Sequence, residues 1–270
     1  MSKILSYEKK NTWIHELSGL SKLIFFLGWC LTSMLTYDTR ILLFMVVFSM
    51  LVFFASKTKW SQVGAVFKMI LFFLILNLLF VFLLAPYQGV EIYGHRTDLF
   101  HIVGSYTLTK EQLYYEFNMM LKYFTVIPAV FMFLVTTDPS EFAASLNRIG
   151  VHYNICYAIS IALRYIPDVQ NDFRDIKHAQ EIRGIEMSKK ANLFSRIKNV
   201  SAIIFPLLFS SMDRIDTVSN AMELRGYGKN KRRTWYYARP LKRNDYLTII
   251  FTVVFTIVAL VITFADGSRF

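Results

Sequence analysis

The apolar stretch from Val63 to Leu84 is the feature that most constrains the fold of this chain. A helix of about 20 apolar residues crosses the hydrocarbon core of a bilayer. Further apolar stretches cover residues 22–36, 41–55, 114–135 and 246–264, although the first two are short for a span. The sequence therefore predicts an all-α integral membrane protein with about five transmembrane helices, and with further helices between the fourth and the fifth.

Charge divides the chain into a membrane part and a basic part. The formal net charge is +11, and most charged residues lie between Asp138 and Asp245. In a chain that is 54% hydrophobic, this balance favours cytoplasmic flanking charge and anionic lipid headgroups over nucleic acid as the partner.

The distribution of Lys and Arg predicts the orientation in the cell membrane. These residues cluster before the first span, between the second and third, and before the last, so the positive-inside rule gives a cytoplasmic N-terminus. We expect a multi-pass protein with residues 85–113 and the C-terminus outside. The predicted regions are 1–136 with four spans, 137–245 in the cytoplasm, and 246–270 as a final helix and external tail.

Several classes of site are not expected. The two cysteines, Cys30 and Cys156, predict free thiols and no disulfide framework. The five histidines form no metal-binding motif, and no phosphate-binding loop or nucleophile elbow occurs. We therefore expect no metal, no cofactor and no ATP hydrolysis by this chain.

A six-residue pattern, Ala-x-Glu-x-Arg-Gly, occurs twice at a spacing of 42 residues. Both copies end an apolar stripe with helical spacing, and a Gly after the last turn is typical of a helix C-terminus. Ala and Arg are four residues apart, so they share a face, and the Arg presents a planar, permanently charged fork. The candidate residues are Ala179, Glu181, Arg183 and Gly184 in the first copy, and Ala221, Glu223, Arg225 and Gly226 in the second.

Either copy alone has a simpler interpretation as an ordinary helix stop, in which Arg stabilises the helix dipole. The repeat inside a basic segment between spans favours two equivalent docking points on a partner.

Other local signals predict the surrounding helices. Asp138-Pro139-Ser140-Glu141 is typical of a helix start, with an N-cap acid, Pro at the first position and Glu three residues after the cap. That helix should end near Gly150. Pro167 and Pro206 should kink the two motif-bearing helices or mark a boundary.

The region from Thr136 to Gly228 resembles the transmembrane T component of energy-coupling factor (ECF) importers for vitamins and metals. The resemblance rests on an ordered series of short segments, whereas the N-terminal spans agree only in hydrophobicity and order. The segments are Asp138-Pro139-Ser140-Glu141-Phe142, Ala162-Leu163-Arg164-Tyr165-Ile166-Pro167, the first Arg-Gly motif, Phe205-Pro206-Leu207-Leu208 and Ala221–Gly228.

The resemblance implies a scaffold and coupling subunit that is not an enzyme. In this family two cytosolic ABC-type ATPases bind paired coupling helices, and their closure is transmitted to one small membrane-embedded S component that carries the substrate specificity. Arg183 and Arg225 would then insert into grooves of the ATPases. The family motif is usually Ala-Arg-Gly or Ala-Arg-Ser, whereas Ile182 and Leu224 precede the arginines here.

An alternative function is a membrane-embedded enzyme that acts on lipid or polyprenyl phosphates with Arg and Lys as anion clamps. Such an enzyme should carry convergent acids or a metal motif, and the sequence shows no such cluster. Asn77 and Lys122 are polar residues within spans, and the sequence assigns neither a role.

Overall fold

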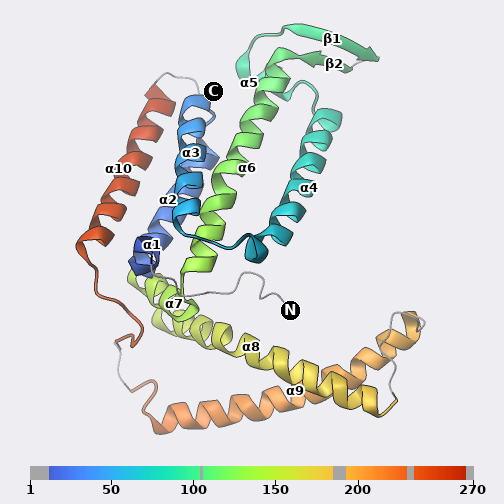
Figure 1. Ribbon diagram of the computed structural model, residues 1–270, viewed down its shortest axis with the longest axis vertical. Coiled ribbons are helices and arrows are strands. Elements are labelled where there is room, and N and C mark those ends of the chain that lie inside the picture. The colour runs from blue at the N-terminus through green and yellow to red at the C-terminus, as the bar shows by residue number, and fades with distance from the viewer. Residues whose placement is uncertain (1–11, 104–105, 185–192, 230–233, 266–270) are drawn as a thin grey trace. The chain divides into compact units, whose positions relative to one another are not determined.

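The computed structural model describes residues 12–103, 106–184, 193–229 and 234–265, and it divides the chain into two compact units (Figure 1). The membrane unit comprises the chain up to Ile149 and from Arg239 onward, and the two-helix unit comprises Gly150–Ala238. The lysines at positions 3, 9 and 10, the arginines at 232 and 233 and the tail after Ala265 lie outside the described residues.

The membrane unit contains eight described helices and one two-stranded antiparallel sheet. The helices are α1 (Trp13–Glu16), α2 (Gly19–Leu35), α3 (Thr39–Ala55), α4 (Trp60–Leu84), α5 (Gln88–Tyr93), α6 (Lys110–Thr136), α7 (Pro139–Arg148) and α10 (Arg243–Ala265). The strands are β1 (Asp98–Val103) and β2 (Tyr106–Thr109).

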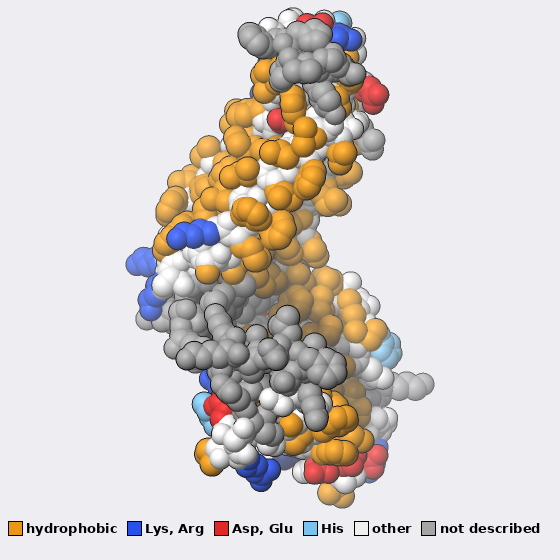
Figure 2. Space-filling view, turned by 90° about the vertical axis from the view of Figure 1, so that its right-hand side faces the viewer, with side chains coloured by type: hydrophobic (Ala, Val, Ile, Leu, Met, Phe, Trp, Pro, Cys, Tyr) orange, Lys and Arg blue, Asp and Glu red, His pale blue; other side chains and the backbone are white. Residues whose placement is uncertain are grey.

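Five apolar helices occupy the predicted spans, but they differ in length. Three are long and apolar enough to cross a membrane, namely Val63–Leu84 within α4, together with α6 and α10. Helices α2 and α3 are apolar but have only 17 residues each, which is at the lower limit for a span. Figure 2 shows hydrophobic side chains over much of the membrane unit, as expected for a surface that faces lipid.

Aromatic stacking builds the core of the membrane unit. Trp29 of α2 is fully buried, and its ring lies 4.9 Å from that of Phe25, 5.2 Å from that of Phe48 and 5.0 Å from that of Phe255. These rings come from α2, α3 and α10. Because lipid tails are as apolar as the side chains, close packing of this kind holds membrane helices together.

Polar contacts fasten the start of α2 to two helices that lie far away in sequence. The Asp245 carboxylate of α10 accepts a hydrogen bond from the Ser18 backbone N–H at 2.7 Å. The Glu141 carboxylate of α7 accepts one from the Gly19 N–H at 2.8 Å and lies 3.6 Å from the Arg239 guanidinium. These acids satisfy N–H groups that the first turn of α2 leaves without helical partners.

The predicted start of α7 is confirmed. The Asp138 carboxylate caps the helix by accepting from the Ser140 N–H at 2.8 Å, and Pro139 occupies the first turn. Glu141, which the sequence placed in the same local signal, makes the long-range contact with Gly19 described above. A local pattern therefore identified the helix start but not the destination of this carboxylate.

The segment 85–113 contains structure that the sequence analysis did not predict. It holds α5, β1 and β2. Helix α5 lies so close to α6 that a Cβ on Gly89 would come within 2.4 Å of the Glu111 carbonyl oxygen, and the Gly89 N–H donates to the Gln112 side chain at 2.9 Å. Glycine is therefore required at this contact.

The two polar residues within spans have different surroundings. The Lys122 amino group donates to the Met34 carbonyl at 3.4 Å and lies 3.2 Å from the centre of the Tyr37 ring, so it is satisfied inside the membrane unit. The Asn77 side-chain oxygen is buried and has no hydrogen-bond partner within the described part of the chain.

The two-helix unit consists of α8 (Tyr153–Ile182) and α9 (Leu193–Leu224), which pack antiparallel (Figure 1). Contacts between the two helices join later residues of α8 to earlier residues of α9, as expected for antiparallel packing. Gln180 donates to the Ala202 carbonyl, Arg214 pairs with Asp172, and the Tyr157 and Tyr227 rings stack at 5.1 Å. Both helices continue through their prolines, so Pro167 and Pro206 are not boundaries.

Candidate functional site

The two copies of the repeated motif end α8 and α9 with the same backbone geometry. In each copy the Arg is the residue that caps the helix, and its N–H donates to the carbonyl of the motif Ala, at 3.3 Å for Arg183 and 3.2 Å for Arg225. The glycines that follow have positive φ angles, +85° at Gly184 and +70° at Gly226, as the sequence predicted.

The second copy has the full pair of hydrogen bonds that defines a Schellman cap. The Gly226 N–H donates to the Glu223 carbonyl at 2.8 Å, and the Tyr227 N–H donates to the Met222 carbonyl at 2.9 Å. The first copy has the equivalent of the first bond, from Gly184 to Glu181 at 3.0 Å, and the next residue lies outside the described part. The caps hold both arginines at equivalent positions.

The motif side chains project outward. The Ala, Glu and Arg residues of both copies are exposed. Ile182 and Leu224, which precede the arginines, are 88% and 90% exposed and are thus among the most accessible large apolar side chains. Among the described residues, neither the Arg183 nor the Arg225 guanidinium has an ion-pair partner. In the described part of the chain, each helix end therefore presents an apolar side chain beside an arginine that forms no ion pair.

The two helix ends lie at opposite ends of the two-helix unit. Gln180 of the first copy contacts α9 near its start, whereas Tyr227, just after the second copy, stacks on Tyr157 near the start of α8. The 26 residues from Tyr157 to Arg183 would span about 39 Å in a straight helix, at a rise of about 1.5 Å per residue. The two motif-bearing ends are therefore separate surfaces of the unit.

The surroundings of the two arginines differ. In the first copy, the Glu181 carboxylate lies 3.6 Å from the Lys177 amino group and 3.2 Å from the His178 ring on the same helix. In the second copy, Arg225 lines a hollow of about 340 Å³ between the two helices. The hollow is lined by Tyr157, Ile161, Arg164, Tyr165, Val218, Ala221, Met222, Arg225 and Tyr227.

Sequence reasoning missed Arg164 as part of this site. Arg164 lies 61 residues before Arg225, and the two meet only because α8 and α9 run antiparallel. The sequence signal that could have identified Arg164 is the segment Ala162–Pro167, which the sequence analysis used only as evidence for the family resemblance.

An apolar face on α9 is a second candidate surface. Its large apolar side chains lie in the middle of α9 and are exposed. The face comprises Ile204, Phe205, Leu208, Phe209, Met212 and Ile215. Contiguous exposed apolar surface of this kind marks contact with a protein or a membrane.

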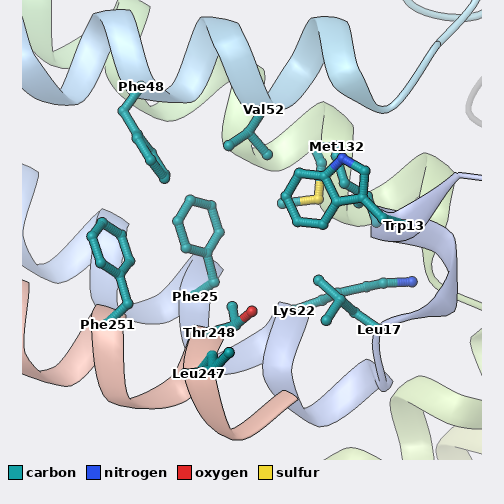
Figure 3. A pocket seen from close by; sticks show the side chains of 11 residues that line it. Trp13, Leu17, Lys22, Phe25, Phe48, Val52, Met132, Leu247, Thr248 and Phe251 are labelled. Atoms are coloured by element: carbon teal, nitrogen blue, oxygen red, sulfur yellow. The ribbon is translucent and has the colours of Figure 1, made fainter. Parts of the chain in front are cut away.

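The membrane unit has its own cavity of about 220 Å³, lined by α1, α2, α3, α6 and α10 (Figure 3). Its walls are aromatic and aliphatic, and the Lys22 amino group points away from Phe25 and Phe251 and donates to the Thr136 carbonyl at 2.8 Å. No carboxylate is found among the described residues that line the cavity. It therefore lacks the acids that an enzyme acting on lipid phosphates would need there.

The described residues include neither a metal-binding cluster nor a disulfide. No group of three or more His, Cys, Asp or Glu side chains could hold a metal ion there. Cys30 and Cys156 are free thiols, as predicted, and burial raises the pKa of Cys156.

Comparison with known proteins identifies the family. Residues 10–236 match the family CbiQ, described as cobalt transport protein. Because this match covers most of the chain, the protein belongs to the CbiQ family, and it is a transmembrane T component of ECF type.

Two relatives are similar to this chain over almost its full length. The chain is 27% identical to the energy-coupling factor transporter transmembrane protein EcfT of Streptococcus equi, over 92% of this chain and 91% of that protein. It is 26% identical to EcfT of Lactococcus lactis, over 93% of this chain and 94% of that protein. These relatives are named as membrane components of transporters, so the chain is a transporter component, and the alternative of a lipid-phosphate enzyme is dropped.

A third relative has a different name. A putative ABC transporter ATP-binding protein of Bifidobacterium longum is 32% identical over 132 residues, which are 46% of this chain but 17% of that protein. A segment similar to this chain thus occurs within a longer protein that is named for ATP binding.

Proposed function

We propose that this chain is the scaffold and coupling subunit of an ATP-driven importer for a vitamin or a metal ion. Two cytosolic ABC-type ATPases bind the two motif-bearing helix ends, and one small membrane-embedded S component binds the substrate. Closure of the ATPases moves α8 and α9, which in turn move the S component. ATP hydrolysis belongs to the separate ATPase subunits.

The observation that carries this proposal is the duplicated helix end. Two equivalent helix ends on one helix pair each present an exposed apolar side chain and an Arg that has no ion-pair partner among the described residues. This combination suits an apolar helix-in-groove contact with a charged tip. The relative named as an ATP-binding protein supports the choice of ATPases as the partners.

The apolar face of α9 supports the S component as the second partner. A membrane-embedded subunit can cover exposed Phe and Leu side chains that would be unfavourable in water. The vitamin or metal itself would contact the S component, so nothing in this chain is proposed to select it.

The composition of the complex tests the proposal. Affinity purification of the tagged chain in mild detergent, followed by native mass spectrometry, should give two ATPase subunits and one S component per copy. A stable complex that transports substrate and contains no ATPase would contradict it.

We propose the orientation that the Lys and Arg distribution predicts. The N-terminus and residues 137–245 lie in the cytoplasm, whereas residues 85–113 and the C-terminus lie outside. The functional regions are then 1–136, 137–245 and 246–270, and α7 belongs to the cytoplasmic region while it packs on α2.

Cysteine labelling in intact cells tests this orientation. Asp175 and His95 are exposed, and Asp175→Cys and His95→Cys can be introduced singly into a variant without Cys30 and Cys156. An impermeant maleimide should label position 95 in intact cells and position 175 only after permeabilisation. Labelling of position 175 in intact cells would reverse the orientation.

A further inference from the structure

The second helix end carries a feature that the motif itself does not contain. Arg225 shares its hollow with Arg164 of α8 and with the side chains of Tyr157, Tyr165 and Tyr227. The lining residues include two guanidinium groups and no carboxylate. A wall of this composition is complementary to an anion, because arginine forks and tyrosine hydroxyls both donate hydrogen bonds to oxygen.

Glu223, Asp168 and Asp172 of the same two helices do not line this hollow, although Asp168 follows Arg164 by one helical turn. Glu223 is two residues from Arg225, a spacing that does not place side chains on one face, and it is not among the lining residues. Asp172 pairs with Arg214 in a neighbouring hollow, which Asp168 also lines. Within the described residues, neither Arg164 nor Arg225 forms an ion pair.

The hollow is fixed in shape by aromatic packing. Tyr227 stacks on Tyr157 with ring centres 5.1 Å apart, and its hydroxyl donates to the Asn154 side chain at 3.4 Å. The Schellman cap fixes the backbone between Arg225 and Tyr227. The backbone that carries each arginine is therefore ordered before any partner arrives, which reduces the entropic cost of binding.

We infer that Arg164 and Arg225 together bind one acidic side-chain group of the ATPase at the second helix end. This inference rests on the proposed function and adds a residue to it. The carboxylate belongs to an ATPase because Arg225 stands in the same cap, beside the same kind of exposed apolar tip, as Arg183. Among the described side chains, the first end presents Arg183 near Glu181, whose carboxylate is paired on its own helix with Lys177 and His178.

A double-mutant cycle tests this inference. The chain, purified with its S component, is reconstituted in nanodiscs of neutral phosphatidylcholine, and its affinity for the ATPases is measured. Arg164→Gln should weaken binding about tenfold, as expected when a carboxylate loses one charge-assisted donor. In combination with Arg225→Gln, Arg164→Gln should reduce the affinity little further, because both arginines bind one acid. In combination with Arg183→Gln, the two fold-losses of affinity should multiply, because the two sites are independent.

Matched variants separate the inference from its alternatives. Arg174 is exposed on the same helix and lines none of the hollows described above, so Arg174→Gln should stay within twofold of wild type. Arg164→Lys should recover part of the affinity, because it keeps the charge but loses the fork. Unchanged thermal melting of Arg164→Gln would show that folding is intact.

The possible failures are distinguishable. If Arg183→Gln and Arg225→Gln weaken binding but Arg164→Gln does not, the inference is wrong and the proposed function stands. If none of the three variants weakens ATPase binding, both the inference and the proposed function are wrong. If the Arg164→Gln effect appears only when phosphatidylglycerol is present, the hollow takes a lipid phosphate, and the inference is also wrong.

Discussion

The membrane unit has a core of buried apolar side chains beneath an apolar surface, whereas the described part of the two-helix unit buries almost none. In the membrane unit, side chains such as Trp29, Leu42, Met45 and Val135 are fully buried between helices. In the two-helix unit, Cys156, Gln180 and Ile203 are the only buried residues among those whose burial is described. Large side chains such as Phe205 and Phe209 are exposed instead.

This difference indicates that the two units are stabilised by different contacts. Burial of an apolar side chain contributes to the stability of the chain itself only where the chain supplies the cover. The exposed apolar face of α9 contributes to stability only when a partner covers it. Equivalent substitutions should therefore affect folding in one unit and assembly in the other.

The largest effect on the chain alone is expected at Trp29. Trp29→Ala should remove the stacking with Phe25, Phe48 and Phe255 and leave a cavity, at a cost of about 3–5 kcal/mol. Thermal melting of the purified subunit in detergent measures the change. Trp29→Phe is the control and should cost much less, and an unchanged melting temperature for Trp29→Ala would contradict the account of this core.

A comparable effect on assembly is expected on the apolar face of α9. Phe205→Ser, Leu208→Ser and Phe209→Ser combined should leave melting of the isolated subunit nearly unchanged, because these side chains are exposed. Binding of the S component should fall by at least about a hundredfold, since each buried side chain contributes about 1.5–3 kcal/mol. Retention of the S component by this variant would refute the assignment of the face.

A smaller effect is expected at the apolar tips of the motifs. Leu224→Ala should weaken ATPase binding about tenfold, because a largely exposed Leu would be buried in a partner groove at a gain of about 1.5–3 kcal/mol. Ile182→Ala should behave in the same way at the other end. Binding measurements that show no change for either variant would mean that the tips stay in solvent in the complex.

The smallest effect is expected from the ion pair beside the first motif. The Lys177 amino group lies 3.6 Å from Glu181, and both side chains are more than one-third exposed. An exposed pair at this spacing contributes about 0.3–0.5 kcal/mol, so Lys177→Ala should change melting and ATPase binding very little. A large loss of binding would show that Lys177 itself contacts the partner.

The elements of the two-helix unit could be predicted from sequence because their signals are local. The Arg-Gly motif and the following glycine indicated the helix ends, and Gly184 and Gly226 have the expected positive φ. Asp138 and Pro139 likewise indicated the start of α7. Such signals depend on residues within about one helical turn.

The tertiary contacts could not be predicted in this way. Asp245 contacts Ser18 across 227 residues, and Glu141 contacts Gly19 across 122. Arg164 and Arg225 line one hollow only because α8 and α9 are antiparallel. The sheet of β1 and β2 lies in a segment predicted as a loop. Whether Pro167 and Pro206 end or continue a helix also depends on packing that a single sequence does not reveal.

Arg183 and Arg225 are proposed to dock the two ATPases. The direct measurement compares ATPase co-purification and substrate uptake for Arg183→Ala, Arg225→Ala and the double variant. Each single change should cost about 2–5 kcal/mol at its own site, yet weaken assembly only in part, because the second site keeps the partner at high effective concentration. The double variant should insert in the membrane but lose the ATPases and uptake. Normal uptake with a full complement of ATPase in the double variant would show that these arginines only cap their helices.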